Sequence, residues 1–300
     1  MQDLHGVAAG RFDAALAAMT GVLRSCGFAR VHTPIVEHRA TFTRSLGAET
    51  DIISKEMYSV GGSSEELVLR PEGTAAVLRA HLGGGGHRGG VARSYYAGPM
   101  FRHERPQAGR LRQFTQVGAE VLGAAGPGVD AEVIGTAWRS VRCALDTLAG
   151  SAAPPVEVLV NSLGTAQERQ TYTADLAVYL AAHAEALSPG SRAKLQSGHV
   201  LGVLDSKAPQ DAPVLEHAPM LPQHWGADTS AEWEQLTSTL QRWGVPFRHT
   251  PGLVRGLDYY NGTAFEVVVA GGSGRALTLA GGGRYDALAT ALGARAPLPA

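Results

Sequence analysis

Polar residues spaced two apart make residues 98–121 the most chemically informative segment of this 300-residue chain. The segment reads GPMFRHERPQAGRLRQFTQVGAEV, which predicts two strands joined by a charged turn. A glycine between a glutamine and a glutamate leaves room for a small ligand, so one face of the second strand is expected to line a pocket. An ordinary charged surface hairpin is the alternative. Because side chains alternate between the faces of a strand, the pocket face should carry Arg112, Phe114, Gln116, Gly118 and Glu120.

Arginines cluster around the turn of this predicted hairpin. Arg102 ends the first strand, and its planar guanidinium suits paired contacts with phosphate or carboxylate oxygens. The turn from His103 to Arg112 also carries Arg105, Gln107 and Arg110. Several arginines on one loop can attract phosphates and contact base edges in a protein whose formal net charge is only -1. A solvated charged turn is the alternative.

The elements before residue 161 are expected to position this hairpin. Apolar residues from Phe12 to Cys26 recur at helical spacing, and Gly27 follows as a C-cap. Val31–Val36, interrupted by Pro34, is interpreted as an edge strand. The other predicted elements are a strand over Glu66–Arg70, a helix from an N-cap at Thr74 to His81, a helix capped by Asp130 that runs to Leu148, and a strand over Val156–Val160.

Residues 162–250 are interpreted as a mostly helical insertion, because several prolines interrupt the helical segments there. Thr229 and Glu232 form a capping-box pattern for one of its helices. Strands return over Tyr259–Val269 and Ala276–Ala280. Hairpins in place of βαβ crossovers favour an α+β fold, with helices packed on an antiparallel sheet. The chain has no P-loop pattern GxxxxGK[ST], which argues against a nucleotide-binding fold of that type.

Composition indicates an ordinary globular protein. Hydrophobic residues make up 44% of the chain and charged residues 18%. Cys26 and Cys143 form no CxxC pair and the histidines lack metal-ligand spacing, so neither a disulfide framework nor a protein-bound metal is expected. No apolar run is interpreted as reaching the roughly 20 residues that span a membrane. The N-terminus lacks a signal-peptide core, so a cytoplasmic protein without a membrane partner is expected.

The hairpin resembles motif 2 of the class II aminoacyl-tRNA synthetases, and most closely the histidyl-tRNA synthetase form. From Phe101 to Glu120 the chain follows FRxERPQxGRxRQFxQxGxE almost without interruption. The resemblance implies a class II synthetase-like antiparallel sheet and a homodimer built through motif 1. Four further stretches resemble the same family in the same order: its motif 1 region at 44–58, LRPEGTA at 69–75, the histidine signature LVRGLDYYNGTAFE at 253–266, and GGGRYDAL at 281–288.

The resemblance implies that the protein activates L-histidine with ATP and Mg²⁺ and transfers it to tRNA(His). Activation builds charge on phosphoryl oxygens, so fixed cations are needed beside them. The implied catalytic cations are Arg102 and Arg255, and Arg112 joins them at ATP. A surface salt bridge is the plain alternative for Arg255. The implied contacts of the tRNA acceptor end are Arg105, Gln107 and Arg110.

Recognition of histidine requires groups that serve both imidazole nitrogens. Glu120 could accept from a ring N–H, and Tyr259 or Tyr260 could serve the other nitrogen; such a site rejects apolar isosteres, because its own polar groups would be left unpaired. Glu72 could instead be a charge favoured by a helix N-terminus, and Tyr285 could be core packing or pocket lining. The implied histidine site comprises Glu72, Gly73, Thr74, Arg102, Gln116, Glu120, Arg255, Tyr259, Tyr260 and Tyr285.

The resemblance also implies a division of the chain. Residues 1–161 would form the first part of the catalytic core, 162–250 the insertion, and 251–300 the continuation of the core. The chain is expected to stop before motif 3 and the anticodon-binding domain of the family. Two alternatives to the ligase therefore stay open: the histidine-binding regulatory subunit of ATP phosphoribosyltransferase, and an inactive fragment of the synthetase.

Overall fold

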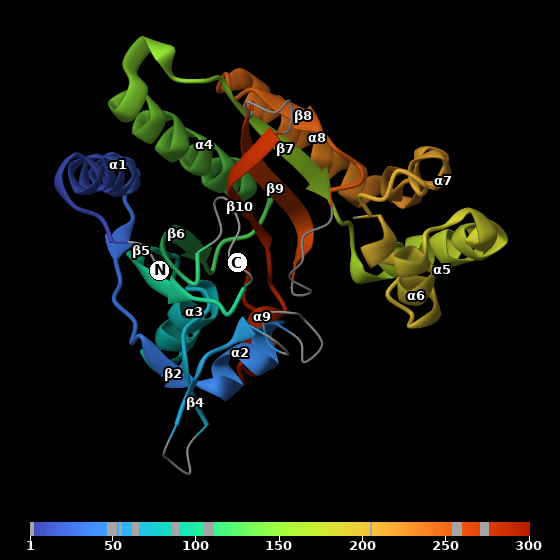
Figure 1. Cartoon of the computed structure of the whole chain (residues 1–300), viewed down its shortest axis with the longest axis horizontal. Helices are drawn as coiled ribbons and strands as arrows, with labels where there is room; N and C mark the ends of the chain where they lie inside the picture. The colour runs from blue at the N-terminus through green and yellow to red at the C-terminus, as the bar shows by residue number, and fades with distance from the viewer. Residues whose placement is uncertain are drawn as a thin grey trace.

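The protein has an α+β fold, seen in a computed structural model as helices packed around small β-sheets (Figure 1). The structure describes residues 3–46, 53, 56–61, 66–85, 90–104, 111–204, 206–253, 260–270 and 276–300. Longer strands pair antiparallel, while β1 (Ala29–Arg30) with β5 (Ala92–Phe101) and β7 (Val156–Ser162) with β8 (Phe247–His249) are short parallel pairs. The expected α+β class is confirmed.

The first sheet contains the hairpin predicted from the sequence. Its strand order is β1–β5–β6, with β6 at Gln113–Leu122. β5 and β6 are ten residues long and pair antiparallel without a register shift. The register places Gly98 opposite Gln116, Tyr96 opposite Gly118, and Ser94 opposite Glu120.

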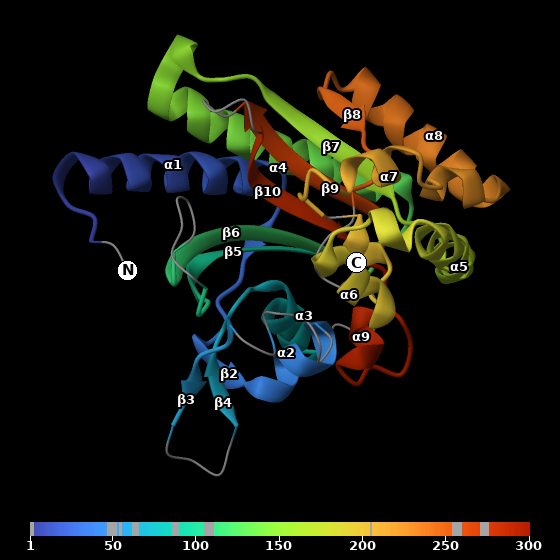
Figure 2. The same cartoon turned by 45° about the vertical axis from the view of Figure 1, so that its right-hand side comes forward.

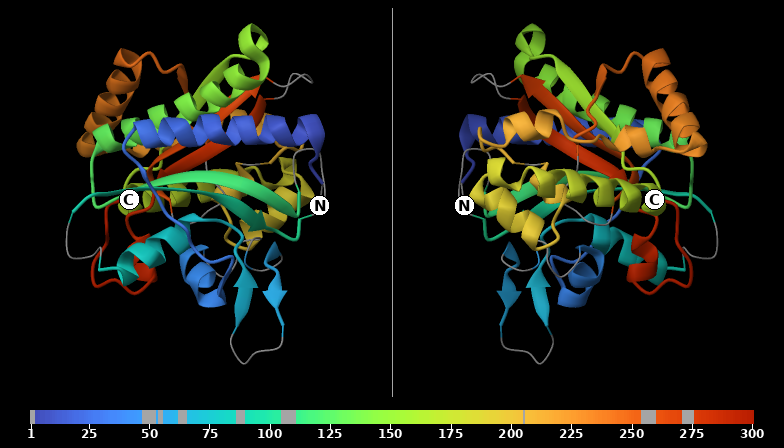
Figure 3. Two further views of the ribbon diagram at one scale, coloured as in Figure 1. Left: turned by 90° about the vertical axis from the view of Figure 1, so that its left-hand side faces the viewer. Right: turned by 90° about the vertical axis from the view of Figure 1, so that its right-hand side faces the viewer.

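Two long helices lie over this hairpin. α1 (Gly6–Ser25) packs along α4 (Pro127–Ala149) and contacts β5 and β6 (Figure 3). α1 ends as expected, because Gly27 has a φ of 81°, which glycine adopts without strain. α4 begins one turn earlier than predicted. Its N-cap is Gly126, so Asp130 lies inside the first turn and its side chain is used elsewhere.

The second sheet has the order β10–β9–β7–β8, with β9 at Asn261–Ala270 and β10 at Ala276–Arg284. α4 and α8 (Ala227–Arg242) pack on it, and their apolar residues form one core with the inner face of the sheet. The core includes alternate residues of β7, as the period of a strand requires. Its most buried members are Ala131, Ile134, Val158, Val160, Leu240 and Val267.

A small third sheet lies below the hairpin, in the order β2 (Val36–His38), β4 (Leu67–Leu69), β3 (Ser59–Val60). The helices α2 (Arg39–Leu46) and α3 (Thr74–Gly83) lie beside it, and α9 (Leu288–Ala291) contacts both helices (Figure 2).

The predicted strand over Val31–Val36 was wrong, because strand structure stops at Arg30 and resumes only at Val36. Arg70 explains the interruption. Its guanidinium donates to the carbonyls of Thr33, at 2.8 Å, and Pro34, at 3.4 Å, so these two groups bind a side chain and not a neighbouring strand.

The helices of the predicted insertion gather on one side of the molecule (Figure 2). Their core includes the fully buried Leu176, Leu180 and Leu187. The division at residues 161 and 250 stays a prediction, since α8 and β8 within that range pack with the second sheet. The remaining elements are η3 (Gly150–Ala152), α5 (Ala166–Ala182), η4 (Ala184–Ala186), α6 (Pro189–Gln196), η5 (Leu201–Val203), α7 (Ala212–Glu216) and η6 (Leu221–His224).

Glu168 joins the first and last helices of this region. Its carboxylate accepts from the amides of Thr165 and Gly226 and from the Thr229 hydroxyl, at 2.7, 2.5 and 2.8 Å. Thr165 and Glu168 thus form the capping box of α5. The predicted box of Thr229 and Glu232 was wrong. Gly226 is the N-cap of α8, and Thr229 lies one turn inside the helix, where it bonds Glu168.

Glu168→Ala should destabilise the protein by about 1–3 kcal/mol, because one change removes a capping box and the bond between two helix starts. Burial tends to raise the pKa of Glu168, but the hydrogen bonds from Gly226 and Thr165 outweigh it and hold the pKa below its usual range. The stabilisation should therefore be present at neutral pH and fade as the pH falls through that lowered pKa. Urea unfolding measures both effects. The exposed Glu185→Ala is the control, and equal losses in both variants would contradict the assignment.

α1 has the length and apolar composition of a membrane-spanning helix, the one such helix among the described residues. Only 11% of the stretch is buried. Signal sequences and the core helices of other proteins can have the same length and apolar composition. The chain therefore does contain one stretch that meets these two criteria. In the structure the C-terminal part of α1 packs into the protein, where Leu23 joins a buried cluster with Phe28, Tyr95 and Val121.

Candidate active site

A cavity of about 220 Å³ lies beside the pocket face of β6, between the first sheet, β10 and α4. Apolar side chains of α1 and α4, such as Leu23 and Val133, line part of it. Polar side chains from six separate segments of the chain line the rest, so the fold gathers residues that are far apart in sequence. These polar residues are Glu72, Thr74, Tyr96, Arg102, Gln116, Glu120, Asp130, Thr136, Ser140, Tyr260, Thr263, Arg284 and Tyr285.

Glu120 is the central carboxylate of the cavity. It is buried on β6, and its Oε1 accepts from the Thr74 hydroxyl at 2.8 Å while Oε2 accepts from the Tyr285 hydroxyl. Burial raises the pKa of Glu120 to about 7, even though the hydrogen bonds from Tyr285 and Thr74 act in the opposite direction. The side chain can therefore hold or release a proton near neutral pH.

Glu72 is the second buried carboxylate, at the start of α3. It accepts from the backbone amides of Thr74 and, at 2.9 Å, of Ala75. Burial raises its pKa, although these amides and the charge of Arg102 pull it down. Glu72 is thus a charge at a helix N-terminus, as one of the two interpretations held, because it accepts from the first amides of α3. It lines the cavity as well. Thr74 is not the N-cap that the sequence suggested, because Gly73 is, which frees the Thr74 hydroxyl for Glu120.

Tyr96 occupies the space that the sequence analysis had left for a ligand over Gly118. It stands opposite Gly118 on β5, and a Cβ at either Gly118 or Gly73 would collide with its ring. Its hydroxyl lies 3.4 Å from Gln116 Oε1. The glycine is therefore needed for close packing of a tyrosine that itself lines the cavity. The sequence analysis missed Tyr96, although counting the hairpin register back from the turn would have paired it with Gly118.

Arg102 stands at the end of β5 with its side chain at the cavity. Its Nε donates to the Pro71 carbonyl at 3.0 Å, its guanidinium lies 5.2 Å from the centre of the Phe114 ring, and Nη1 is 3.8 Å from Glu104. These contacts orient the planar cation. Arg112 lies differently: its Nε donates to the Glu104 carbonyl at 3.3 Å, its side chain is exposed, and it does not line the cavity.

Tyr260 and Tyr285 are both buried and both line the cavity. Tyr285 thus combines the two roles that the sequence left open, since it also belongs to a hydrophobic core cluster. Five other predicted site residues lie outside the described part of the chain: Arg105, Gln107, Arg110, Arg255 and Tyr259.

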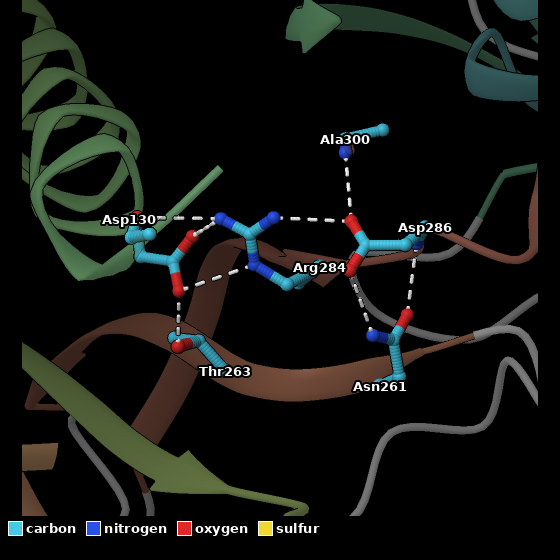
Figure 4. A network of polar contacts seen from close by, with 7 residues as sticks. Asp130, Asn261, Thr263, Arg284, Asp286 and Ala300 are labelled. Carbon is cyan, nitrogen blue, oxygen red and sulfur yellow. Dashed lines mark hydrogen bonds and ion pairs between the residues drawn. The ribbon is translucent and has the colours of Figure 1, made fainter. Parts of the chain in front are cut away.

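A second polar network, which the sequence analysis also missed, surrounds Arg284, the residue before Tyr285 in the chain (Figure 4). Arg284 binds Asp130 of α4 and Asp286, while Thr263 of β9 donates to the same Asp130 at 2.6 Å. The sequence carries little sign of this network, because Asp130 is interpreted there as the cap of a helix and not as a partner of a distant arginine. Among the described residues, no group of three or more His, Cys, Asp or Glu side chains could hold a metal ion.

The fold and the site together define a class II aminoacyl-tRNA synthetase architecture. A motif 2 hairpin turns its polar face into a buried cavity, which a Gly-rich strand borders on the opposite side. The family model described as Histidyl-tRNA synthetase matches residues 1–298. The chain belongs to the histidyl-tRNA synthetase family.

Curated relatives agree with this family. The histidine–tRNA ligase of Alkalilimnicola ehrlichii is 42% identical over 281 residues, which are 93% of this chain and 63% of that relative. The ligase of Synechococcus sp. is 44% identical over 281 residues, which are 93% of this chain and 65% of the relative. The chain thus spans less than two thirds of the length of these relatives.

Solved structures show the same fold. Apo Staphylococcus aureus histidyl-tRNA synthetase has a TM-score of 0.74 at 27% identity, covering 100% of this chain and 68% of the other. A Bacillus halodurans structure described as an ATP phosphoribosyltransferase regulatory subunit/histidyl-tRNA synthetase has a TM-score of 0.69 at 21% identity, covering 100% of this chain and 78% of the other. At that identity the likeness shows the fold alone.

Proposed function

We propose that the protein is a histidine–tRNA ligase, which activates L-histidine with ATP and transfers it to tRNA(His). The observation that carries the proposal is the buried Glu120 carboxylate, oriented by Thr74 and Tyr285 inside the cavity. A carboxylate has about four lone-pair sites, so Glu120 keeps capacity for an imidazole N–H after accepting two hydrogen bonds. Membership of the histidyl-tRNA synthetase family supports the same substrate.

The other residues around the cavity fit the remaining parts of histidine. Glu72 places a second carboxylate for the α-ammonium group, with Gln116 and Thr74 as neighbouring polar contacts and Gly73 beside them. Tyr260 is suited to pack against the imidazole or bond its second nitrogen; Tyr259 is the alternative. A site that pairs both ring nitrogens discriminates strongly against apolar side chains of similar shape.

In the proposed reaction the histidine carboxylate attacks the α-phosphate of ATP, and pyrophosphate leaves. ATP enters with Mg²⁺ as a substrate complex. Negative charge grows on the phosphoryl oxygens, and a fixed, planar cation stabilises it more than mobile water does. Arg102 is such a cation, because Pro71 and Phe114 orient it beforehand. Arg255 and Arg112 are proposed to complete the ATP site.

The partners of the whole protein are also proposals. Arg105, Gln107 and Arg110 are proposed to meet the acceptor end of tRNA(His). A homodimer is proposed from the motif 1 resemblance, and the exposed apolar Ile35 and Val36 nearby are consistent with a covered surface. A cytoplasmic location without a membrane partner is proposed from membership of the histidyl-tRNA synthetase family.

A histidine-binding regulatory subunit of ATP phosphoribosyltransferase is the second candidate, which the fold of the Bacillus halodurans structure keeps open. The curated relatives favour the ligase, because those at 42% and 44% identity are histidine–tRNA ligases. An inactive fragment of the synthetase is the third candidate.

Exchange of labelled pyrophosphate into ATP tests the proposal. We expect exchange that depends on L-histidine and Mg²⁺ and is absent with phenylalanine, which has a flat ring but no ring nitrogen. Activation of an added phosphoribosyltransferase without exchange would favour the regulatory subunit. Histidine binding without exchange or activation would favour the inactive fragment, and the absence of histidine binding would refute the site.

A further inference from the structure

Arg284 at the end of β10 is fully engaged by other parts of the chain (Figure 4). Its Nη2 donates to Asp130 Oδ1 at 2.6 Å and to the Gly126 carbonyl at 3.3 Å, and its Nη1 donates to Asp286 Oδ1 at 3.0 Å. Only 11% of the side chain is exposed. A guanidinium has the planar fork that such a two-sided arrangement needs, and lysine does not. The residue therefore fastens β10 to the first turn of α4.

Both acidic partners of Arg284 are themselves held. Asp130 Oδ2 accepts from the Thr263 hydroxyl of β9 at 2.6 Å. Asp286 accepts from the Asn261 side chain at 3.1 Å and from the Ala300 amide at 2.9 Å. Each of the two aspartates is thus anchored to a further segment of the chain, so the Arg284 side chain is held at a fixed point in the fold. The hydrogen bonds and ion pairs of Arg284 reach none of the described groups proposed to bind substrate, although its side chain lines the same cavity.

Tyr285 lies between these fixed points. Arg284 and Asp286 hold the chain on both sides of it, and its own amide donates to the Ala300 carbonyl at 2.9 Å. Its hydroxyl donates to Glu120. This backbone fixes the position from which the Tyr285 side chain extends, and hence where its hydroxyl meets Glu120.

The strand before Arg284 is poorly suited to hold that direction unaided. Gly282 and Gly283 precede it, and glycine gives the backbone more freedom than any other residue. The glycines are required, because a Cβ at Gly283 would lie 2.6 Å from the Thr263 carbonyl and one at Gly282 would lie 2.8 Å from the Phe265 ring. A strand that must be glycine for close packing needs an anchor at its end.

We propose that Arg284 is a positioning residue for histidine recognition, which aims the Tyr285 hydroxyl at Glu120 by clamping β10 between Asp130 and Asp286. The proposal rests on the proposed function, because it assigns Arg284 to the same site. Misplacement of such a donor by about 1 Å can cost large factors in binding or rate. The other groups that face Glu120 are Thr74 directly, with Glu72 and Tyr96 nearby.

A double-mutant cycle of Arg284→Lys and Tyr285→Phe tests the proposal. Lysine keeps the charge, so the partly buried aspartates are not both left without a cation, but it cannot bridge the two. We expect each single variant to weaken L-histidine binding roughly tenfold, the effect of losing one hydrogen bond to a charged group. The double variant should bind within about twofold of Tyr285→Phe, since Arg284 would act through the missing hydroxyl. Calorimetric titration with L-histidine measures all four affinities.

Arg248→Lys is the matched control, because Arg248 pairs with Glu157 at an exposed site. It should bind histidine as the unchanged protein does. Losses that multiply in the double variant, or unchanged affinity in Arg284→Lys, would overturn the proposal.

A second measurement separates this proposal from the proposed function. Carbon-13 NMR of the Glu120 carboxyl group follows its titration in protein without ligand. Since the Tyr285 hydrogen bond lowers the pKa of Glu120, Arg284→Lys should raise that pKa, and should not raise it further in Tyr285→Phe. An unchanged titration in Arg284→Lys would refute the clamp. If the unchanged protein bound no histidine, the proposed function would fail. The Glu120 titrations of these variants would still decide whether Arg284 positions Tyr285.

Discussion

Glu120→Gln should weaken binding of L-histidine by roughly 10- to 150-fold, because a hydrogen bond to a charged group contributes about 1.5–3 kcal/mol. Glutamine fills the same space but keeps a single acceptor oxygen, which Thr74 and Tyr285 already compete for. The NH₂ group of the glutamine is itself a donor, and it would face the hydroxyl donors of Thr74 or Tyr285. The imidazole N–H would then have no free acceptor in the cavity. Calorimetric titration of the variant with L-histidine measures the loss.

The same variant should change how stability depends on pH. The folded protein raises the pKa of Glu120 from 4.5 to about 7, mainly by burial, so between these values it holds a proton that the unfolded chain releases. The stability that this proton contributes is complete below about pH 4.5 and is lost as the pH rises through 7. Glutamine does not titrate, so urea unfolding from pH 5 to 8 should show a shallower decline, with a remainder from Glu72.

The control for Glu120→Gln is Glu234→Gln, the same exchange at an exposed position of α8. It should keep both the affinity for histidine and the pH dependence of the unchanged protein. Equal histidine affinity in Glu120→Gln and in this control would show that Glu120 does not bind the ligand.

Arg102→Ala should lower histidine-dependent pyrophosphate exchange by about 10²–10³-fold, the usual cost of removing one oriented charge stabiliser from a transition state. The effect should fall mainly on the rate at saturating substrates, because the charge on the phosphoryl group grows only as pyrophosphate leaves. Arg102→Lys should restore little of the activity. A lysine has no planar fork to lie against Phe114 while reaching both Pro71 and a phosphate.

Arg248→Ala is the control for Arg102→Ala, since it removes an arginine from the exposed pair with Glu157. A surface pair of this kind contributes about 0–1 kcal/mol, so exchange should stay at the level of the unchanged protein. An Arg102→Ala variant that kept full exchange, with Arg248→Ala as a reference for folding, would remove Arg102 from the reaction.

Local sequence was sufficient for the elements and for the residues that belong to one strand. The hairpin from Ala92 to Leu122 follows from two apolar runs around a charged turn, and the shared face of Gln116 and Glu120 follows from strand alternation. The opening helix follows in the same way from helical spacing up to Gly27. The edge strand at Val31–Val36 and the box at Thr229 failed, because distant groups, Arg70 and Glu168, take those hydrogen bonds.

The sequence by itself thus determined the fold class, the family resemblance and one polar wall of the cavity, since these depend on patterns within single helices, strands and short motifs. The tertiary structure alone decided which partners complete that wall. Thr74 and Tyr285 bond Glu120 across 46 and 165 positions of the chain, and Asp130 binds Arg284 across 154. Pairings over such separations leave no periodic trace in the sequence. They form only once packing has brought the segments together, as it also does for the Tyr96 ring over Gly118.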